Sequence, residues 1–87
     1  MEKNMSKQQY KAVFCKRVKV IDRAPVYINA RTHDILKRTV TNMGVFKLSI
    51  SALVENIITD HLQKYESQIN EIQQDEQERL YPSQDGL

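Results

Sequence analysis

The chain has 87 residues, a formal net charge of +2 and a single cysteine, Cys15. This length allows at most one small domain, which would be marginally stable alone, and one cysteine excludes an internal disulfide. No apolar run approaches the roughly 18 residues that a membrane span needs, and the N-terminus lacks a signal-peptide core, so we expect a cytoplasmic protein without a membrane partner.

The charge changes sign along the chain. Residues 1–23 sum to +5, residues 24–48 to +3 and residues 49–87 to −6. Such asymmetry indicates contact with nucleic acid at the basic end, and it leaves the acidic end for solvation or for another partner. Two solvated surfaces of opposite sign are the alternative.

The first 22 residues carry little pattern. Residues 1–11, MEKNMSKQQYK, are polar and aperiodic, which predicts a mobile segment. Residues 12–21, AVFCKRVKVI, are rich in β-branched side chains with weak alternation, so a short strand or an extended segment is expected there. We therefore predict a basic, flexible N-terminal arm over residues 1–22.

Residues 24–28 alternate in side-chain character, as a strand does. One face is apolar and the other is mixed: Ala24, Val26 and Ile28 against Arg23, Pro25 and Tyr27. Proline cannot donate to a ladder, so Pro25 restricts the strand to an edge or to a two-stranded ribbon. In the reversed phase, which is the alternative, Tyr27 would be a core aromatic.

Two helices should follow this strand. Asn29 stands where an N-cap belongs, so the first helix is expected to begin at about Ala30, and Gly44 should end it as a left-handed residue. After a short loop, Ser49 or Ser51 can cap a second helix that begins at about residue 50.

The second helix carries an apolar stripe with coiled-coil spacing. Its members step by four or three residues: Val54, Ile58, Leu62, Tyr65, Ile69 and Ile72. From Ile58 onward the average step is 3.5, which requires a partner helix. No Gly or Pro interrupts the chain between Gly44 and Pro82, so the helix can continue past Tyr65, and YPSQDGL at the end reads as disordered.

A single strand with two helices leaves both strand edges open, and a second copy of the chain would close them. We therefore predict a mostly α fold with one short β-strand, as an intertwined homodimer with a two-stranded antiparallel ribbon and an extended C-terminal helix. The expected dimer core consists of apolar side chains from all three elements: Val26, Ile28, Leu36, Val40, Leu53, Val54, Ile57, Ile58, Leu62 and Tyr65.

These motifs resemble the ribbon-helix-helix family of dimeric DNA-binding proteins over residues 23–66. The resemblance rests on VYIN leading into a helix, on Gly44 sixteen residues after Ile28, and on SISALVENII. PVYINARTHDILKR with SISALVENIITDHLQKY is also similar to a family of small proteins encoded in conjugative transposons of anaerobic gut bacteria. By this resemblance, residues 23–66 dimerise and bind DNA, and residues 67–87 form an acidic helical extension and tail.

The resemblance also implies the contacts with double-stranded DNA. The outward face of the ribbon would enter the major groove, with base contacts from Arg23, Pro25 and Tyr27, although proline has no group that reads a base. The start of the second helix, with Lys47, Ser49 and Ser51, would meet a phosphate. Salt-sensitive phosphate contacts would be added by Lys16, Arg17, Lys19 and Arg31. Plain helix capping is the alternative role of the two serines, and a solvated surface position is the alternative for Arg23.

The function expected on this basis is a homodimeric DNA-binding protein of a mobile element, acting as a transcriptional repressor or as an accessory factor in DNA transfer or excision. The alternative is an antitoxin-like or adaptor module that binds a protein through the acidic residues 66–87. The sequence lacks a nucleophile–base pair and a phosphate-binding glycine loop, so neither enzyme activity nor a cofactor is expected. His33 and His61 lack the ligand spacing of a metal site, and Cys15 is expected to be a small buried or an incidental cysteine.

Overall fold

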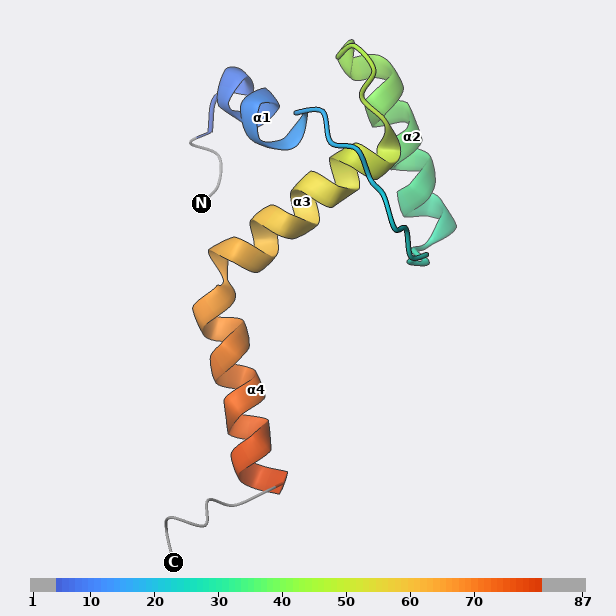
Figure 1. Ribbon diagram of the computed structural model, residues 1–87. Coiled ribbons are helices and arrows are strands. Elements are labelled where there is room, and N and C mark those ends of the chain that lie inside the picture. The colour runs from blue at the N-terminus through green and yellow to red at the C-terminus, as the bar shows by residue number, and fades with distance from the viewer. Residues whose placement is uncertain (1–4, 81–87) are drawn as a thin grey trace, which may run out of the picture.

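The computed structural model describes residues 5–80, and within them all regular secondary structure is helical. The four helices are α1 (Lys7–Phe14), α2 (Ala30–Met43), α3 (Ile50–Lys64) and α4 (Glu66–Leu80). α3 contacts each of the other three, and α4 leads away from α1 and α2 (Figure 1). Residues 1–4 and 81–87, which hold the start of the expected arm and the expected disordered end, lie outside the described residues.

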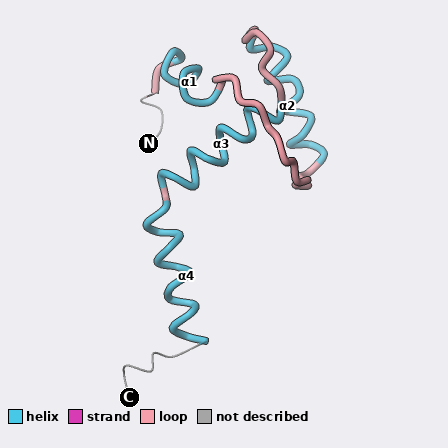
Figure 2. The backbone as a smooth tube through the Cα atoms, in the orientation of Figure 1, coloured by secondary structure: helices cyan, strands magenta, loops and turns pink. Residues whose placement is uncertain are grey.

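The predicted ribbon-helix-helix fold is wrong, because no strand occurs among residues 5–80. The segment between α1 and α2, residues 16–29, which we call the connector, follows a loop path throughout (Figure 2). Among residues 5–80, no backbone–backbone hydrogen bond joins residues 16–28 to another segment, and Pro25 has no amide hydrogen to donate. The alternation in this stretch therefore belongs to an exposed connector, in which Val26 and Tyr27 are 74% and 91% exposed.

Part of the segment expected to be a flexible arm forms α1. Ser6 caps this helix, because its hydroxyl accepts from the Gln9 amide at 3.1 Å while the Gln9 side chain accepts from the Ser6 amide at 2.8 Å. This reciprocal pair satisfies two amides at the helix start. Tyr10 and Phe14 lie one turn apart on α1, with ring centroids separated by 4.7 Å, and both pack against the core.

The starts of α2 and α3 are confirmed at Ala30 and Ile50. Asn29 occupies the N-cap position of α2 but makes no side-chain capping bond, whereas the Ser49 hydroxyl accepts from the Ala52 amide at 3.0 Å. Gly44 ends α2 in the left-handed region, with φ of 71°. The turn between the two helices is therefore set by a glycine on one side and by a capping serine on the other.

The core is small and centred on the first turns of α3. Its buried apolar residues are Cys15, Leu48, Ala52 and Leu53, surrounded by Tyr10, Phe14, Val18, Leu36, Val40, Met43 and Val45. Asn56 is the buried polar residue, 2% exposed, and its side-chain nitrogen donates to the carbonyl oxygens of Phe14 and Lys16, both at 2.9 Å. One side chain of α3 thus satisfies carbonyls at the end of α1 and at the start of the connector.

The residues expected to form a dimer core divide into three groups in the single chain. Leu53 is buried, and Leu36, Val40 and Val54 are half-buried. The others are exposed: Val26, Ile28, Ile57, Ile58, Leu62 and Tyr65. The fold of one chain therefore uses fewer than half of these apolar positions.

The helix continues past Tyr65, as expected, but with a break. Tyr65 has φ of −109° and ψ of 23°, outside the α-helical region, and α4 resumes at Glu66. No residue of α4 is buried, and its polar surface carries an ion pair between Arg79 and Glu76. The radius of gyration of the molecule is 17.9 Å, against about 12 Å for a compact domain of this length, because α4 extends from the body.

Candidate nucleic-acid interface

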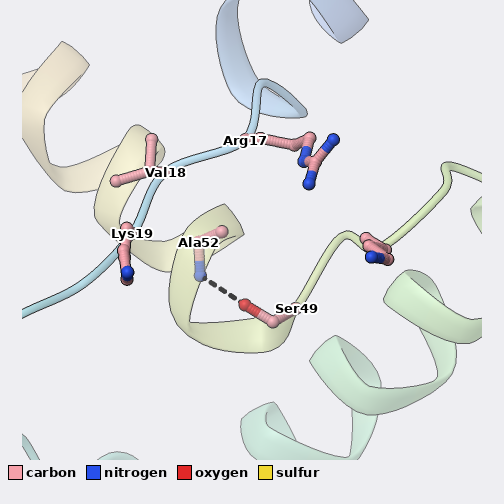
Figure 3. Close-up of a pocket in the computed structure, with 6 residues that line it drawn as sticks. Arg17, Val18, Lys19, Ser49 and Ala52 are labelled. Atoms are coloured by element: carbon pink, nitrogen blue, oxygen red, sulfur yellow. Dashed lines mark hydrogen bonds between the residues drawn. The ribbon is translucent and has the colours of Figure 1, made fainter.

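A shallow groove of about 480 Å³ lies where the connector crosses the first turn of α3 (Figure 3). Its lining comes from the connector, from the loop before α3 and from α3 itself: Arg17, Val18, Lys19, Lys47, Ser49 and Ala52. Three of these six residues are cationic and none is acidic. We call this feature the basic groove.

The connector brings two of the cations to the groove. Val18 is half-buried and packs against the core, while its neighbours Arg17 and Lys19 are exposed. Successive side chains of an extended segment point to opposite sides, so anchoring Val18 inward turns both neighbours outward. The hydrogen bond from Asn56 to the carbonyl of Lys16 holds the connector at this level of α3.

Lys47 supplies the third cation from an unusual backbone conformation. Its φ is 61°, in the left-handed region that side chains other than glycine rarely adopt. The cost of such a conformation is about 1 kcal/mol, and residues held there concentrate at functional sites. The Lys47 ammonium lies 5.4 Å from the ring centroid of Phe46, an aromatic side chain that is 75% exposed.

The backbone of α3 adds positive potential to the groove. The Ser49 hydroxyl satisfies the Ala52 amide, and both residues line the groove (Figure 3). The other amides of a first helical turn have no partner within the helix, and the helix dipole places partial positive charge at this end. Side chains and backbone therefore combine at one place to favour an anion.

The structure gathers some of the sequence-predicted contact residues and separates others. Arg17, Lys19, Lys47 and Ser49, all predicted to contact phosphate, line the basic groove together. The other three predicted phosphate contacts, Lys16, Arg31 and Ser51, are exposed and are not among its lining residues.

The three predicted base contacts lie on the connector, outside the lining of the groove. Pro25 and Tyr27 are exposed, and the guanidinium of Arg23 donates from Nε to the carbonyl of Val20 at 3.0 Å. The base-reading ribbon face to which these residues were assigned is absent from the described residues. Their assignment as base readers therefore loses its structural basis.

Sequence reasoning missed the residue that holds the connector in place. Asn56 follows Ala52 by four positions and Leu53 by three, so it lies on the same, buried face of α3. A polar residue on an apolar helix face was the available signal. The partners of its side chain, at the end of α1, could not be foreseen because α1 itself was not predicted.

Residues 5–80 contain no group of three His, Cys, Asp or Glu side chains that could hold a metal ion. His33 lies on α2 and His61 on α3, where the ring centroids of His61 and Tyr65 are 4.9 Å apart with the ring planes tilted by 48°. Within the same described range, no helix has both the length and the apolar character needed to cross a membrane.

Comparison with known proteins gives one match. Residues 1–76 match the family described as "Protein of unknown function (DUF3408)". The chain belongs to this family. No curated protein and no solved structure matches the chain. In this DUF3408 chain the matched range includes α1, the connector, α2, α3 and most of α4, so the residues of the basic groove all lie inside the family region.

Proposed function

We propose that the protein is a cytoplasmic DNA-binding protein that holds the phosphate backbone of duplex DNA in the basic groove. The observation that carries this proposal is the convergence of Arg17, Lys19 and Lys47 at the capped start of α3. These cations come from segments about 30 residues apart, and they meet where the helix also presents unsatisfied amides. Phosphate is an anion that both features favour.

Backbone contacts of this kind set affinity and position on DNA but carry no base information. We therefore expect binding that depends weakly on sequence and strongly on salt. Each phosphate contact contributes about 0.9 to the slope of log affinity against log salt concentration, so three contacts contribute about 2.7. This behaviour separates backbone binding from base recognition.

The test compares two triple variants by fluorescence anisotropy on a labelled duplex between 50 and 200 mM KCl. Arg17→Gln, Lys19→Gln and Lys47→Gln together remove the cations of the groove. Lys7→Gln, Lys37→Gln and Arg38→Gln remove the same charge from α1 and α2 and serve as the matched control.

The groove variant should bind on the order of 100-fold more weakly at 0.1 M salt, with the salt slope lower by about 2.7, because three released counterions are lost. The control variant should keep most of the affinity. Equal losses in both variants would show that binding follows total charge rather than the groove, and absence of binding by the unmodified protein at 50 mM KCl would exclude DNA as the ligand.

A role in a mobile genetic element, as a transcriptional repressor or as an accessory factor in DNA transfer or excision, is part of this proposal. It rests on the similarity of PVYINARTHDILKR and SISALVENIITDHLQKY to proteins encoded in conjugative transposons. Nuclease footprinting on a promoter and on a transfer-origin fragment of such an element separates the two roles. Phosphate contacts alone should protect both fragments to a similar extent. Preferential protection of the promoter would favour repression and preferential protection of the origin would favour transfer, and either result would require base contacts outside the basic groove.

A further inference from the structure

α3 has two apolar sides, and one of them is uncovered. The side that carries Leu53 and Asn56 is buried against α1, α2 and the connector. Ile58 and Leu62, spaced by one turn, are 41% and 51% exposed. Residues two positions apart on a helix point about 200° apart, so Ile58 faces away from Asn56 and from the body.

The uncovered side continues into α4. Tyr65 is 38% exposed, Ile69 is half-buried and Ile72 is 67% exposed. The Tyr65 amide donates to the carbonyl of His61 at 3.0 Å, and the Ile69 amide donates to the carbonyl of Tyr65 at 2.9 Å. Backbone hydrogen bonds of α3 and α4 therefore meet at Tyr65 from both sides, and the three- and four-residue apolar spacing continues in sequence from one helix to the next. We call this set the exposed stripe: Ile58, Leu62, Tyr65, Ile69 and Ile72.

α4 extends away from the rest of the chain, as Figure 1 shows. It has 15 residues, mostly polar, and none of them is buried. An isolated helix of this length is marginal in water, and most helical stability in proteins comes from packing of an apolar face. The apolar side chains that α4 can pack belong to the exposed stripe. A stable α4 therefore requires another helix packed against this stripe.

We propose that a second copy of the chain packs antiparallel along the exposed stripe, with the two-fold axis at Tyr65. α3 and α4 have 15 residues each and lie on either side of Tyr65. The proposed two-fold axis bisects the angle between α3 and α4. Rotation about it places α4 of each copy along the full length of α3 of the partner copy. The same operation pairs Ile58 of one copy with Ile72 of its partner copy, because each lies seven residues from Tyr65.

Charge decides the orientation. α4 holds five acidic residues and one basic residue, a net charge of −4, whereas α3 has a net charge of −1. A parallel dimer would place two helices of −4 side by side, which like-charge repulsion disfavours. The antiparallel dimer instead places each acidic α4 beside α3 of the partner copy, whose net charge is −1, so the repulsion is weaker.

The basic groove stays open in this dimer. Ala52 is buried against the body and Ser49 precedes the first turn of α3, so neither residue belongs to the exposed stripe. The dimer would therefore present two grooves, one on each copy. The inference concerns a surface separate from the groove, so it does not depend on the proposed DNA binding.

Analytical ultracentrifugation tests the interface. The unmodified protein should sediment as a dimer at tens of micromolar, and Leu62→Asp should sediment as a monomer that keeps the hydrogen-exchange protection of α3 around Leu53. Val26→Asp, at a residue that is 74% exposed but lies outside the stripe, is the matched control and should remain dimeric. Loss of the dimer in Val26→Asp with retention in Leu62→Asp would place the interface on the connector and overturn the proposal.

Cysteine cross-linking tests the orientation in a Cys15→Ala background. Copies with Ile58→Cys and copies with Ile72→Cys should form a disulfide when mixed, and neither variant should do so alone, since bridged Cα atoms must lie within about 7 Å. Cross-linking of each variant with itself would indicate a parallel dimer and contradict the proposal. A monomer that yields no cross-link in any mixture would also overturn the proposal, and that result would leave α4 available to a different protein partner.

The groove variants described above should remain dimeric, so a failure of DNA binding and a failure of dimerisation are distinguishable.

Discussion

Asn56 is the residue on which the position of the basic groove depends most directly. Its amide donates to two carbonyl oxygens, those of Phe14 and Lys16, and is itself 2% exposed. Each such hydrogen bond contributes about 0.5 to 1.5 kcal/mol to stability. The side chain therefore stabilises the fold and also fixes the segment from which Arg17 and Lys19 reach the groove.

Replacement of this amide should be costly. Asn56→Ala removes both hydrogen bonds and should lower the free energy of unfolding by about 2 to 3 kcal/mol, since two carbonyls lose their donor. Urea denaturation followed by circular dichroism measures the change. Asn70→Ala, at an exposed asparagine of α4, is the control and should change the free energy of unfolding by less than about 0.5 kcal/mol.

The same position distinguishes hydrogen bonding from packing. Asn56→Asp keeps the shape of the side chain but, when ionised, presents only acceptors to the two carbonyls. Asn56→Asp should therefore be at least as unstable as Asn56→Ala at pH 7. Stability near that of the unmodified protein would show that the two hydrogen bonds contribute little.

At the scale of elements, the helix limits that are set by neighbouring residues were predicted correctly. Asn29, Gly44 and Ser49 mark the limits of α2 and α3 through rules that act within a few residues, and the structure confirms those limits. The prediction of a strand around Val26 was wrong because alternation of side chains alone does not make a strand. A strand needs a second segment to accept and donate its backbone hydrogen bonds, and within residues 5–80 no segment pairs with the connector in this way.

α1 was missed although its signal was present. The pair Ser6 and Gln9 forms a capping box, and Tyr10 and Phe14 follow at helical spacing. The high proportion of polar residues in this segment favoured the interpretation as a flexible arm. The groove could be predicted only in part, because Arg17 and Lys47 meet through the tertiary packing of α1 and the connector on α3, which no local rule contains.

The loop between α2 and α3 offers a test at this scale. Gly44 has φ of 71°, and a Cβ atom added there would meet nothing within 4 Å, so only the backbone conformation resists substitution. Gly44→Ala should lower the melting temperature, corresponding to about 1 kcal/mol of stability, because side chains other than glycine rarely adopt this region.

Gly44→Asn is the matched control. Asparagine tolerates the left-handed region better than alanine, so its loss of stability should be smaller. Differential scanning calorimetry of the two variants measures this order. Equal melting temperatures for Gly44→Ala and the unmodified protein would show that the turn can relax to another conformation.

At the scale of the whole molecule, the chain divides into a packed body and an extended helix. The core around Leu53 involves α1, α2 and α3, and none of its residues comes from α4. Local stability should therefore differ along the chain, with the amides of α4 opening most readily.

Hydrogen exchange should show this difference and its dependence on concentration. At low micromolar concentration the amides of α4 should exchange much faster than those of α3 around Leu53, and the difference should shrink as the concentration rises, because a partner copy that binds the folded helix stabilises it by mass action. Exchange in α4 that is slow and independent of concentration would contradict this expectation.

The hydrogen bonds from Asn56 to Phe14 and Lys16 also bear on the order in which the chain folds. They join residues 42 and 40 positions apart in sequence, whereas α2 and α3 are separated by a six-residue loop. The entropy of closing a loop rises with its length, so the pair of α2 and α3 should form early, and α1 should dock late. On this route the two connector cations meet Lys47 only in the final step, and a folding intermediate with α1 undocked would have lost the arrangement that favours phosphate.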